Sequence, residues 1–199
     1  MAKRRESVTG AEFEAKLKAE GKWDSYMARK KAQEEETRRL EREYARAEAP
    51  LVEALHAAGV PVASAWDLVN TPNHFEDSLP VLLEFLKKPN LDSVREGIAR
   101  ALAVPTARFA WSELLELYRQ EEMPQTKSGI AVALSNICDD DQLDQLIALA
   151  RDPKHGESRI LLLWALEKSK HPSARIALKE LAGDPVLKKE IRLIEGRRT

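Results

Sequence analysis

The chain has 199 residues, and its 32 basic and 33 acidic side chains almost cancel, to a formal net charge of -1. This balance argues against a protein whose main task is to neutralise nucleic-acid phosphates, although it is compatible with a local basic patch. The single cysteine, Cys138, excludes an internal disulfide and a metal cage built from cysteines. No apolar run approaches the roughly 18 residues of a membrane span, and no apolar signal segment follows the basic start. We therefore expect a cytoplasmic protein in a reducing compartment, with no membrane association.

Residue usage predicts an all-α fold. Ala, Leu, Glu, Lys and Arg dominate, and runs of β-branched residues of strand length are scarce. The eight glycines and ten prolines fall almost entirely between segments with helical periodicity. The glycines and prolines thus mark the connections of a helical protein.

The start of the chain is expected to be a charged helical arm at residues 9–49, after a disordered segment at residues 1–8. Thr9-Gly10-Ala11-Glu12 has the form of a capping box, in which the hydroxyl and the carboxylate bind free amide groups at a helix start. This predicts a short helix that stops at Gly21, and then a long helix from Asp24 to about Ala49. The long helix is polar on nearly every side, so ion pairs four residues apart should stabilise it rather than a core.

An interval of 32 residues organises the rest of the chain, residues 50–199. The segments 95–102, 127–134 and 159–166 align without a gap, each with a basic residue first and an Ala-Leu pair last. The same interval relates four further apolar positions, Leu82, Leu114, Leu146 and Leu178. Self-similarity at such a period is the mark of stacked helical repeats. We expect this repeat domain to begin at Pro50, which either starts a new helix or kinks the preceding one.

Turn residues divide the repeat domain into about five helix pairs. The predicted pairs are 50–58 with 63–70, 75–88 with 91–104, 106–121 with 125–137, 140–150 with 156–168, and 172–182 with 186–195. The first and last pairs are the least regular, which suits terminal repeats because each must present a polar face to water.

The segment Val94-Arg95-x-x-Ile98-x-x-Ala101-Leu102 resembles the second helix of a HEAT repeat. The 32-residue spacing is most similar to the short bacterial class of HEAT-like repeats first associated with phycobilisome lyases. The resemblance covers about residues 50–199 and is clear in three repeats of five. It implies an α-solenoid, an α-α superhelix of about five helix pairs, whereas its implications for function are weak because such solenoids serve many roles. Lys127 in place of arginine is one departure from the pattern, and the missing Ala-Leu pair of the fifth repeat is another.

No arrangement of side chains in the sequence predicts catalysis, a metal site or a cofactor site. The four histidines are far apart and lack the spacing that would aim two ligands at one metal: His56, His74, His155 and His171. Neither a nucleophile elbow nor a glycine-rich phosphate loop is present. Cys138 closes a predicted helix at a repeat junction, where a buried structural thiol is the expected role. We therefore expect no catalytic residues, no metal and no cofactor.

The second helices of stacked pairs line a concave surface, which is where a partner is expected to bind. A helical wheel places the following side chains on that surface: Arg100, Val132, Ile160, Leu163 and Trp164. The stripe turns from charged to apolar toward the fourth repeat, so the N-terminal arm or a partner should cover its apolar end. Trp164 has two interpretations, as a core residue after a small rotation of its helix or as an aromatic anchor, whose truncation typically weakens binding by ~2 kcal/mol or more.

The basic residues that open the three aligned segments are Arg95, Lys127 and Arg159. We expect this ladder to bridge adjacent repeats by binding carbonyls or carboxylates. A basic track on the surface is the alternative.

These observations favour a non-catalytic protein-binding solenoid, of the adaptor, assembly-chaperone or toxin-immunity type, that holds another protein on its concave face. We expect a monomer, since the apolar pattern of the long charged helix is broken for more than one turn and does not predict a coiled coil. An alternative is a nucleic-acid binder similar to the alkylpurine DNA glycosylases built from HEAT-like repeats, with Trp66, Asp67, Trp164 and the basic ladder as candidate residues. The near-neutral charge disfavours it. A lyase or chaperone for a tetrapyrrole-carrying protein is a third reading, which rests on the repeat class alone.

Overall fold

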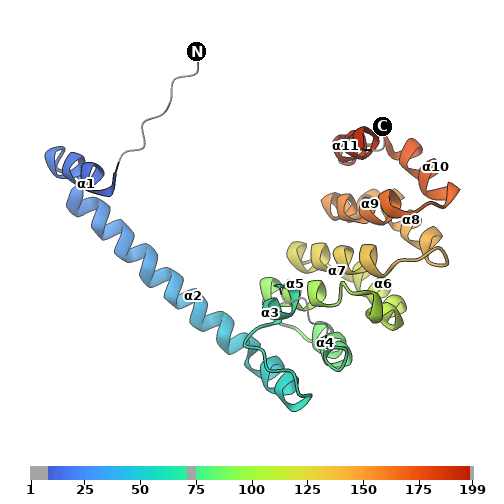
Figure 1. The fold of residues 1–199 in the computed structure, drawn as a ribbon, viewed down its shortest axis with the longest axis horizontal. Coiled ribbons are helices and arrows are strands. Elements are labelled where there is room, and N and C mark those ends of the chain that lie inside the picture. Colours follow the sequence, from blue (N-terminus) through green and yellow to red (C-terminus); the bar gives the residue numbers. More distant parts are fainter. Residues whose placement is uncertain (1–8, 71–74, 198–199) are drawn as a thin grey trace. The chain divides into compact units, whose positions relative to one another are not determined.

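A computed structural model describes residues 9–70 and 75–197 of the chain. Within these ranges all regular structure is helical, which confirms the all-α fold class. None of the helices in these ranges has the length and the apolar side chains that crossing a lipid bilayer requires. Residues 1–8, which the sequence predicts to be disordered, and His74 lie outside the described ranges. The chain divides into two compact units, Met1–Arg46 and Ala47–Thr199 (Figure 1).

In the first unit, a capping box starts helix α1 (Gly10–Ala19) as the sequence predicts. The amide of Glu12 donates to Thr9 Oγ1 at 3.3 Å, and the amide of Thr9 donates to Glu12 Oε2 at 2.8 Å. Gly21, with a φ of 67°, takes the left-handed conformation that turns the chain into the next helix. No residue of α1 is buried, so this unit depends on local helix stability rather than on a core.

Helix α2 (Trp23–Ala57) is one continuous helix that contains Pro50. Of the two alternatives that the sequence left open at Pro50, a new helix or a kink, the structure contradicts the start of a new helix. A proline inside a helix removes one backbone hydrogen bond and crowds the preceding turn. The turns after Pro50 carry Leu51 and Leu55, both completely buried in the second unit. We attribute the continuity of α2 to this burial, because removing two leucine side chains from water stabilises the helix by about 3–6 kcal/mol.

The second unit continues from the end of α2 as a series of short helices joined by tight turns. Their bounds are α3 (Ala65–Asn70), α4 (Ser78–Leu86), α5 (Asp92–Ala101), the 3-10 helix η1 (Pro105–Ala110), α6 (Trp111–Gln120), α7 (Pro124–Ile137), α8 (Leu143–Arg151), the 3-10 helix η2 (Pro153–Ser158), α9 (Arg159–Lys168), α10 (Pro172–Leu181) and α11 (Lys188–Arg197).

These helices pack as consecutive pairs, α4 with α5, α6 with α7, α8 with α9 and α10 with α11. The odd-numbered helices α3, α5, α7, α9 and α11 also pack against one another in chain order, and we call them the odd layer. Figure 1 shows the same succession of helices from α3 to α11. The even-numbered helices cover one side of the odd layer, and α7, at its centre, has nine buried residues.

Two glycines allow the odd helices to approach closely. A Cβ atom on Gly129 of α7 would lie 2.8 Å from the backbone oxygen of Glu96 in α5 and 3.0 Å from Cβ of Ala99. One repeat earlier, a Cβ atom on Gly97 would lie 2.8 Å from Nε1 of Trp66 in α3. Trp66 therefore covers a small residue of the next repeat, which is a packing role.

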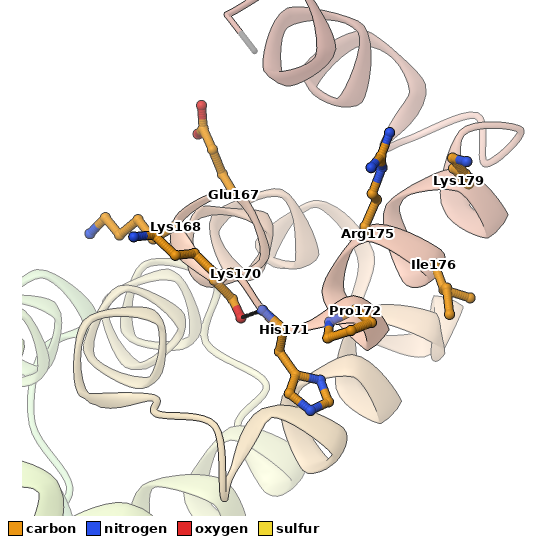
Figure 2. Close-up of a pocket in the computed structure, with 9 residues that line it drawn as sticks. Glu167, Lys168, Lys170, His171, Pro172, Arg175, Ile176 and Lys179 are labelled. Atoms are coloured by element: carbon orange, nitrogen blue, oxygen red, sulfur yellow. Dashed lines mark hydrogen bonds between the residues drawn. The ribbon is translucent and has the colours of Figure 1, made fainter.

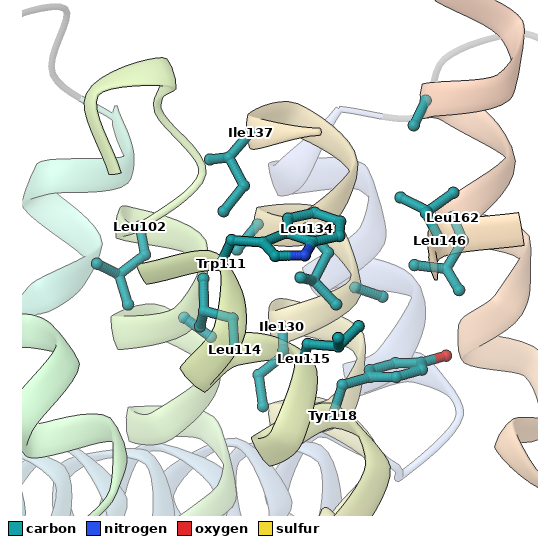
Figure 3. Packing of buried hydrophobic residues seen from close by; sticks show 14 of the residues in the cluster. Leu102, Trp111, Leu114, Leu115, Tyr118, Ile130, Leu134, Ile137, Leu146 and Leu162 are labelled. Carbon is teal, nitrogen blue, oxygen red and sulfur yellow. The ribbon is translucent and has the colours of Figure 1, made fainter. Parts of the chain in front are cut away.

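The core fills the space between the two layers with the residues that the 32-residue interval predicts. Leu82, Leu114 and Leu146 are completely buried and Leu178 is 3% exposed. Figure 3 shows Trp111, Leu114 and Tyr118 of α6 packed against Ile130 and Leu134 of α7. The indole nitrogen of Trp111 donates to Oε1 of Gln145 in α8 at 2.8 Å, so the buried polar atom is satisfied across two repeats.

Candidate functional site

Arg95 joins two helix pairs. Its Nε and Nη2 atoms donate to the carbonyl oxygen of Leu86, at the end of α4, at 3.2 and 3.0 Å. Its Nη1 atom lies 2.7 Å from Oε2 of Glu121, which follows α6. Both side chains are almost buried, with 12% and 7% of their surfaces exposed. Arg95 therefore connects α5 to the ends of α4 and α6.

Arg159 repeats this arrangement two repeats later and is 2% exposed. Its guanidinium donates to the carbonyl oxygen of Ala150, at the end of α8, at 3.2 Å. It also binds both carboxylate oxygens of Asp184, at 2.8 and 3.3 Å, and this pairing holds the pKa of Asp184 below its usual value. Arg159 thus ties α9 to α8 and to the turn before α11, and we call Arg95 and Arg159 the bridge arginines.

Lys127, between them in the ladder, forms a weaker version of the bridge. Its Nζ atom donates to the carbonyl oxygen of Glu121 at 2.9 Å and lies 5.3 Å from the ring centre of Tyr118. Burial lowers the pKa of this lysine. The expected bridging role of the ladder is confirmed for Arg95 and Arg159, and the three residues leave no open basic track.

The helical wheel is wrong for Leu163 and Val132, which are 0% and 7% exposed. The register positions of Leu163 in the preceding repeats, Ala99 and Ala131, are also completely buried. Ala99 lies against Gly129 of the next odd helix, as the glycine contacts show. This column therefore faces a neighbouring helix instead of solvent, because each odd helix is flanked by others on both sides.

Three of the predicted surface residues remain half-buried: Arg100, Ile160 and Trp164. Arg100 donates to Oε1 of Glu96 on its own helix at 2.8 Å, so its charge is already paired. Ile160 packs at the edge of the core. Ile160 and Trp164 are four residues apart and thus share one face of α9, which forms the apolar part of the candidate site.

The same face of α9 leads toward a cavity of about 850 Å³ at the junction of α9 and α10, which we call the basic pocket (Figure 2). It is lined by Glu167, Lys168, Ser169, Lys170, His171, Pro172, Arg175, Ile176 and Lys179. Figure 2 shows Lys168 and Lys170 on one side of it and Arg175, Ile176 and Lys179, from α10, on the other. Ile176 is 55% exposed, so an apolar side chain faces solvent on the α10 side of the basic pocket.

The basic side chains of the pocket have no carboxylate partner among the residues that the structure describes. The segment from Lys168 to Lys179 contains four lysines and arginines and no acidic residue. The flanking carboxylates have other partners, since Glu167 pairs with Arg197 at 2.7 Å and Glu180 pairs with Arg151.

Among the described residues, Lys170, Arg175 and Lys179 form no ion pair, and Lys168 donates only to Oδ1 of Asn136, at 3.2 Å. We call the four basic residues Lys168, Lys170, Arg175 and Lys179 the pocket cations. The helical wheel missed them because they lie at the last residue of α9, in the turn that follows it and on α10. The available signal was the absence of acidic residues over this segment of a chain that is otherwise balanced in charge.

A second cavity, of about 520 Å³, has mixed charge and contains Lys127, Lys154, Glu121, Glu122 and His155 among its lining residues. His155 is 3% exposed, stacks on Tyr118 with 4.7 Å between ring centres, and neither ring nitrogen has a hydrogen-bond partner in the described part of the chain. Burial lowers the pKa of His155 and raises the pKa of Tyr118 to about 12. Both groups are therefore neutral at pH 7.

The contacts of Cys138 and Asp67 indicate structural roles for both side chains. Burial raises the pKa of the Cys138 thiol to about 12, so it stays protonated and weakly nucleophilic at neutral pH. Asp67 accepts hydrogen bonds from the amides of Ala63 and Ser64, at 2.9 and 3.0 Å, at the start of α3.

The ranges that the structure describes hold no cluster of three or more side chains suited to a metal ion. Comparisons of the chain with models of protein families, with curated proteins and with solved structures found no match.

Proposed function

We propose that this chain is a non-catalytic protein-binding α-solenoid, built from HEAT-like helix pairs, that holds another protein on the solvent side of its odd layer. The 32-residue interval and the consecutive pairing of α4 to α11 support the repeat architecture. Repeats of this kind offer an extended surface on their second helices, which are the odd helices of this chain.

The observation that carries the proposal is the half-buried pair Ile160 and Trp164 beside the basic pocket. Tryptophan is over-represented among the residues that dominate binding energy, and such residues are usually surrounded by polar side chains that exclude water. Ile160 and Trp164, with the pocket cations beside them, form an apolar anchor next to polar side chains of this kind. By contrast, Trp66 packs on Gly97 and Asp67 caps α3, so two candidates for the glycosylase-type alternative already have packing roles.

The test is parallel affinity capture from the native lysate with the wild-type chain, Trp164→Ala, Ile160→Ser and a control, Phe109→Ala, with quantification by mass spectrometry. Phe109 is 60% exposed in η1, so its truncation removes a comparable aromatic surface elsewhere. We expect a protein captured by the wild type and the control to be lost with both α9 variants. Equal capture by all four chains would exclude a binding role for Ile160 and Trp164.

Stability separates the two interpretations of Trp164. A half-buried anchor should reduce the free energy of unfolding by no more than about 1.5 kcal/mol when truncated to alanine, whereas a tryptophan in the core typically contributes about 3–5 kcal/mol. Denaturant unfolding of Trp164→Ala measures this difference. A loss in the higher range with capture retained would show that Trp164 is a core residue.

A further inference from the structure

We infer that the basic pocket binds an acidic peptide segment of the partner protein, one that carries aspartate or glutamate side chains around an aliphatic residue. This inference rests on the proposed protein-binding function and adds the chemistry of the partner. It depends on three properties of the pocket: its unpaired cations, its exposed isoleucine and its position on α9 and α10.

The pocket cations have no carboxylate partner among the described residues, which favours the binding of an anion from another molecule. Arg175 and Lys179 are four residues apart on α10, and like charges at this spacing destabilise a helix. The two carboxylates that flank this segment pair with basic residues outside the pocket, Glu180 with Arg151 and Glu167 with Arg197. The pocket cations lack that compensation, so carboxylates from another chain would relieve their mutual repulsion.

The apolar component favours a peptide over a nucleic acid. Ile176 and Pro172 contribute an aliphatic surface to the same pocket as the basic side chains, which suits a leucine or valine flanked by carboxylates. Nucleic-acid binding depends on many lysine and arginine contacts to phosphate along an extended surface. The four pocket cations are confined to the end of α9, the turn that follows it and α10, in a chain whose net charge is -1.

The position of the pocket makes a continuous binding path with the proposed anchor. Trp164 and Lys168 are four residues apart and lie on one side of α9, with Glu167 between them in sequence. A peptide segment that fills the pocket can therefore extend along α9 toward Trp164. The partner would place an apolar residue against Trp164 and its acidic segment over Lys168, Lys170, Arg175 and Lys179.

The experiment measures the binding of a fluorescein-labelled peptide of glutamate, aspartate and leucine to the full-length chain by fluorescence anisotropy. A matched peptide with glutamine and asparagine at the acidic positions tests the role of charge. The variants are Lys170→Glu/Arg175→Glu in the pocket and Lys189→Glu/Arg192→Glu on the exposed side of α11. Both double variants change the net charge equally, so they separate local binding from general electrostatic attraction.

We expect the acidic peptide to bind, the amide peptide to bind at least about ten-fold more weakly, and the pocket variant to lose at least about ten-fold in affinity. The α11 variant should lose no more than about three-fold. Equal losses in the two variants, or equal binding of the two peptides, would overturn the inference. Tighter binding of a single-stranded oligonucleotide than of the acidic peptide, abolished by the pocket variant, would also overturn it and assign the pocket to nucleic acid.

The outcomes distinguish this inference from the proposed function. If partner capture requires Trp164 but the acidic peptide shows no dependence on the pocket cations, the inference fails and the proposed function stands. If the acidic peptide depends on the pocket but no captured protein depends on Trp164 or Ile160, the α9 surface is excluded as the partner site.

Discussion

Two groups of basic side chains lie in the second unit and differ in their surroundings. The bridge arginines Arg95 and Arg159 are almost buried, and each binds a backbone carbonyl of its own helix pair and a carboxylate beyond it. The pocket cations, of which Lys170 and Arg175 are examples, lie around an open cavity and have no carboxylate partner within the described residues. Arg159 and Arg175 are on neighbouring helices, so the contrast arises from local geometry rather than from distance along the chain.

The comparison shows that the position of the carboxylates determines what a basic residue does here. A buried guanidinium that has lost its water needs acceptors for its donors, and Arg159 finds them in Asp184 and in the carbonyl oxygens of Ala150 and Gly156. A lysine in contact with water needs no partner within the chain, so its charge stays available to bind a carboxylate of another molecule. The bridge arginines are therefore expected to affect folding, and the pocket cations are expected to affect binding.

The largest effect should follow from Arg159→Met. This change keeps the alkyl part of the side chain but leaves Asp184 without its guanidinium and a buried carbonyl oxygen unpaired. Breaking a buried pair on one side typically reduces the free energy of unfolding by about 3–5 kcal/mol. Urea unfolding followed by circular dichroism measures the loss. Stability equal to the wild type would show that the bridge is dispensable.

Arg95→Met should have the same sign and a smaller size, about 2 kcal/mol. Each bridge carboxylate keeps two backbone amides after the change: Glu121 those of Glu122 and Met123, and Asp184 those of Val186 and Leu187. The two bridges differ in the burial of the arginine, since the side chain of Arg95 is 12% exposed and that of Arg159 is 2% exposed, and the less buried pair should contribute less. The same unfolding experiment ranks the two variants, and a larger loss for Arg95→Met would contradict this account of the bridges.

The sequence predicted those parts of the fold that follow from helical period and from the 32-residue interval. The leucine column, the paired helices and the bridging role of Arg95 and Arg159 depend on residues that repeat in register. Local rules left two alternatives open at Pro50, and they could not choose between them because burial of Leu51 and Leu55 overrides the local penalty of a proline inside a helix.

The candidate site was less predictable. A helical wheel separates the core side of a helix from the opposite side, but it cannot tell a side covered by another helix from one in solvent, and Leu163 was misplaced for that reason. The basic pocket required knowledge of tertiary pairing. Glu167 could have neutralised Lys168 or Lys170, but it pairs with Arg197, thirty residues later in the chain.

A pH experiment tests the middle residue of the basic ladder, Lys127, which lies near the buried His155. Burial, and then the charge of Lys127, lowers the pKa of His155 below the value of 6.5 that it has when unfolded. The unfolded chain therefore binds more protons below pH 6.5, and stability is lost as the pH falls through this value toward the folded pKa, by at most about 1.4 kcal/mol per pH unit from this group. Well above pH 6.5, His155 is neutral in both the folded and the unfolded chain, so its titration does not change the free energy of unfolding.

The variant His155→Leu should reduce this loss between pH 7.5 and 5.5, and His56→Gln serves as the control because His56 is exposed. Urea unfolding at the two pH values gives the difference for each chain. An identical pH dependence in the wild type and His155→Leu would show that the burial of His155 does not govern acid sensitivity.

The smallest effect on stability should come from Arg175→Met, the counterpart of Arg159→Met on the neighbouring helix. Arg175 has no ion pair within the described ranges, and its repulsion with Lys179 is removed, so the free energy of unfolding should change by less than about 0.5 kcal/mol, in either direction. The same variant should weaken binding of the acidic peptide, and added salt should weaken the wild type's binding toward the variant's value because exposed charges are screened. Arg159→Met and Arg175→Met thus remove the same charge from adjacent helices. The first should reduce the stability of the fold, and the second should reduce the affinity for the acidic peptide. A stability loss of similar size in both would mean that Arg175 has an internal role, and the distinction between bridge arginines and pocket cations would then fail.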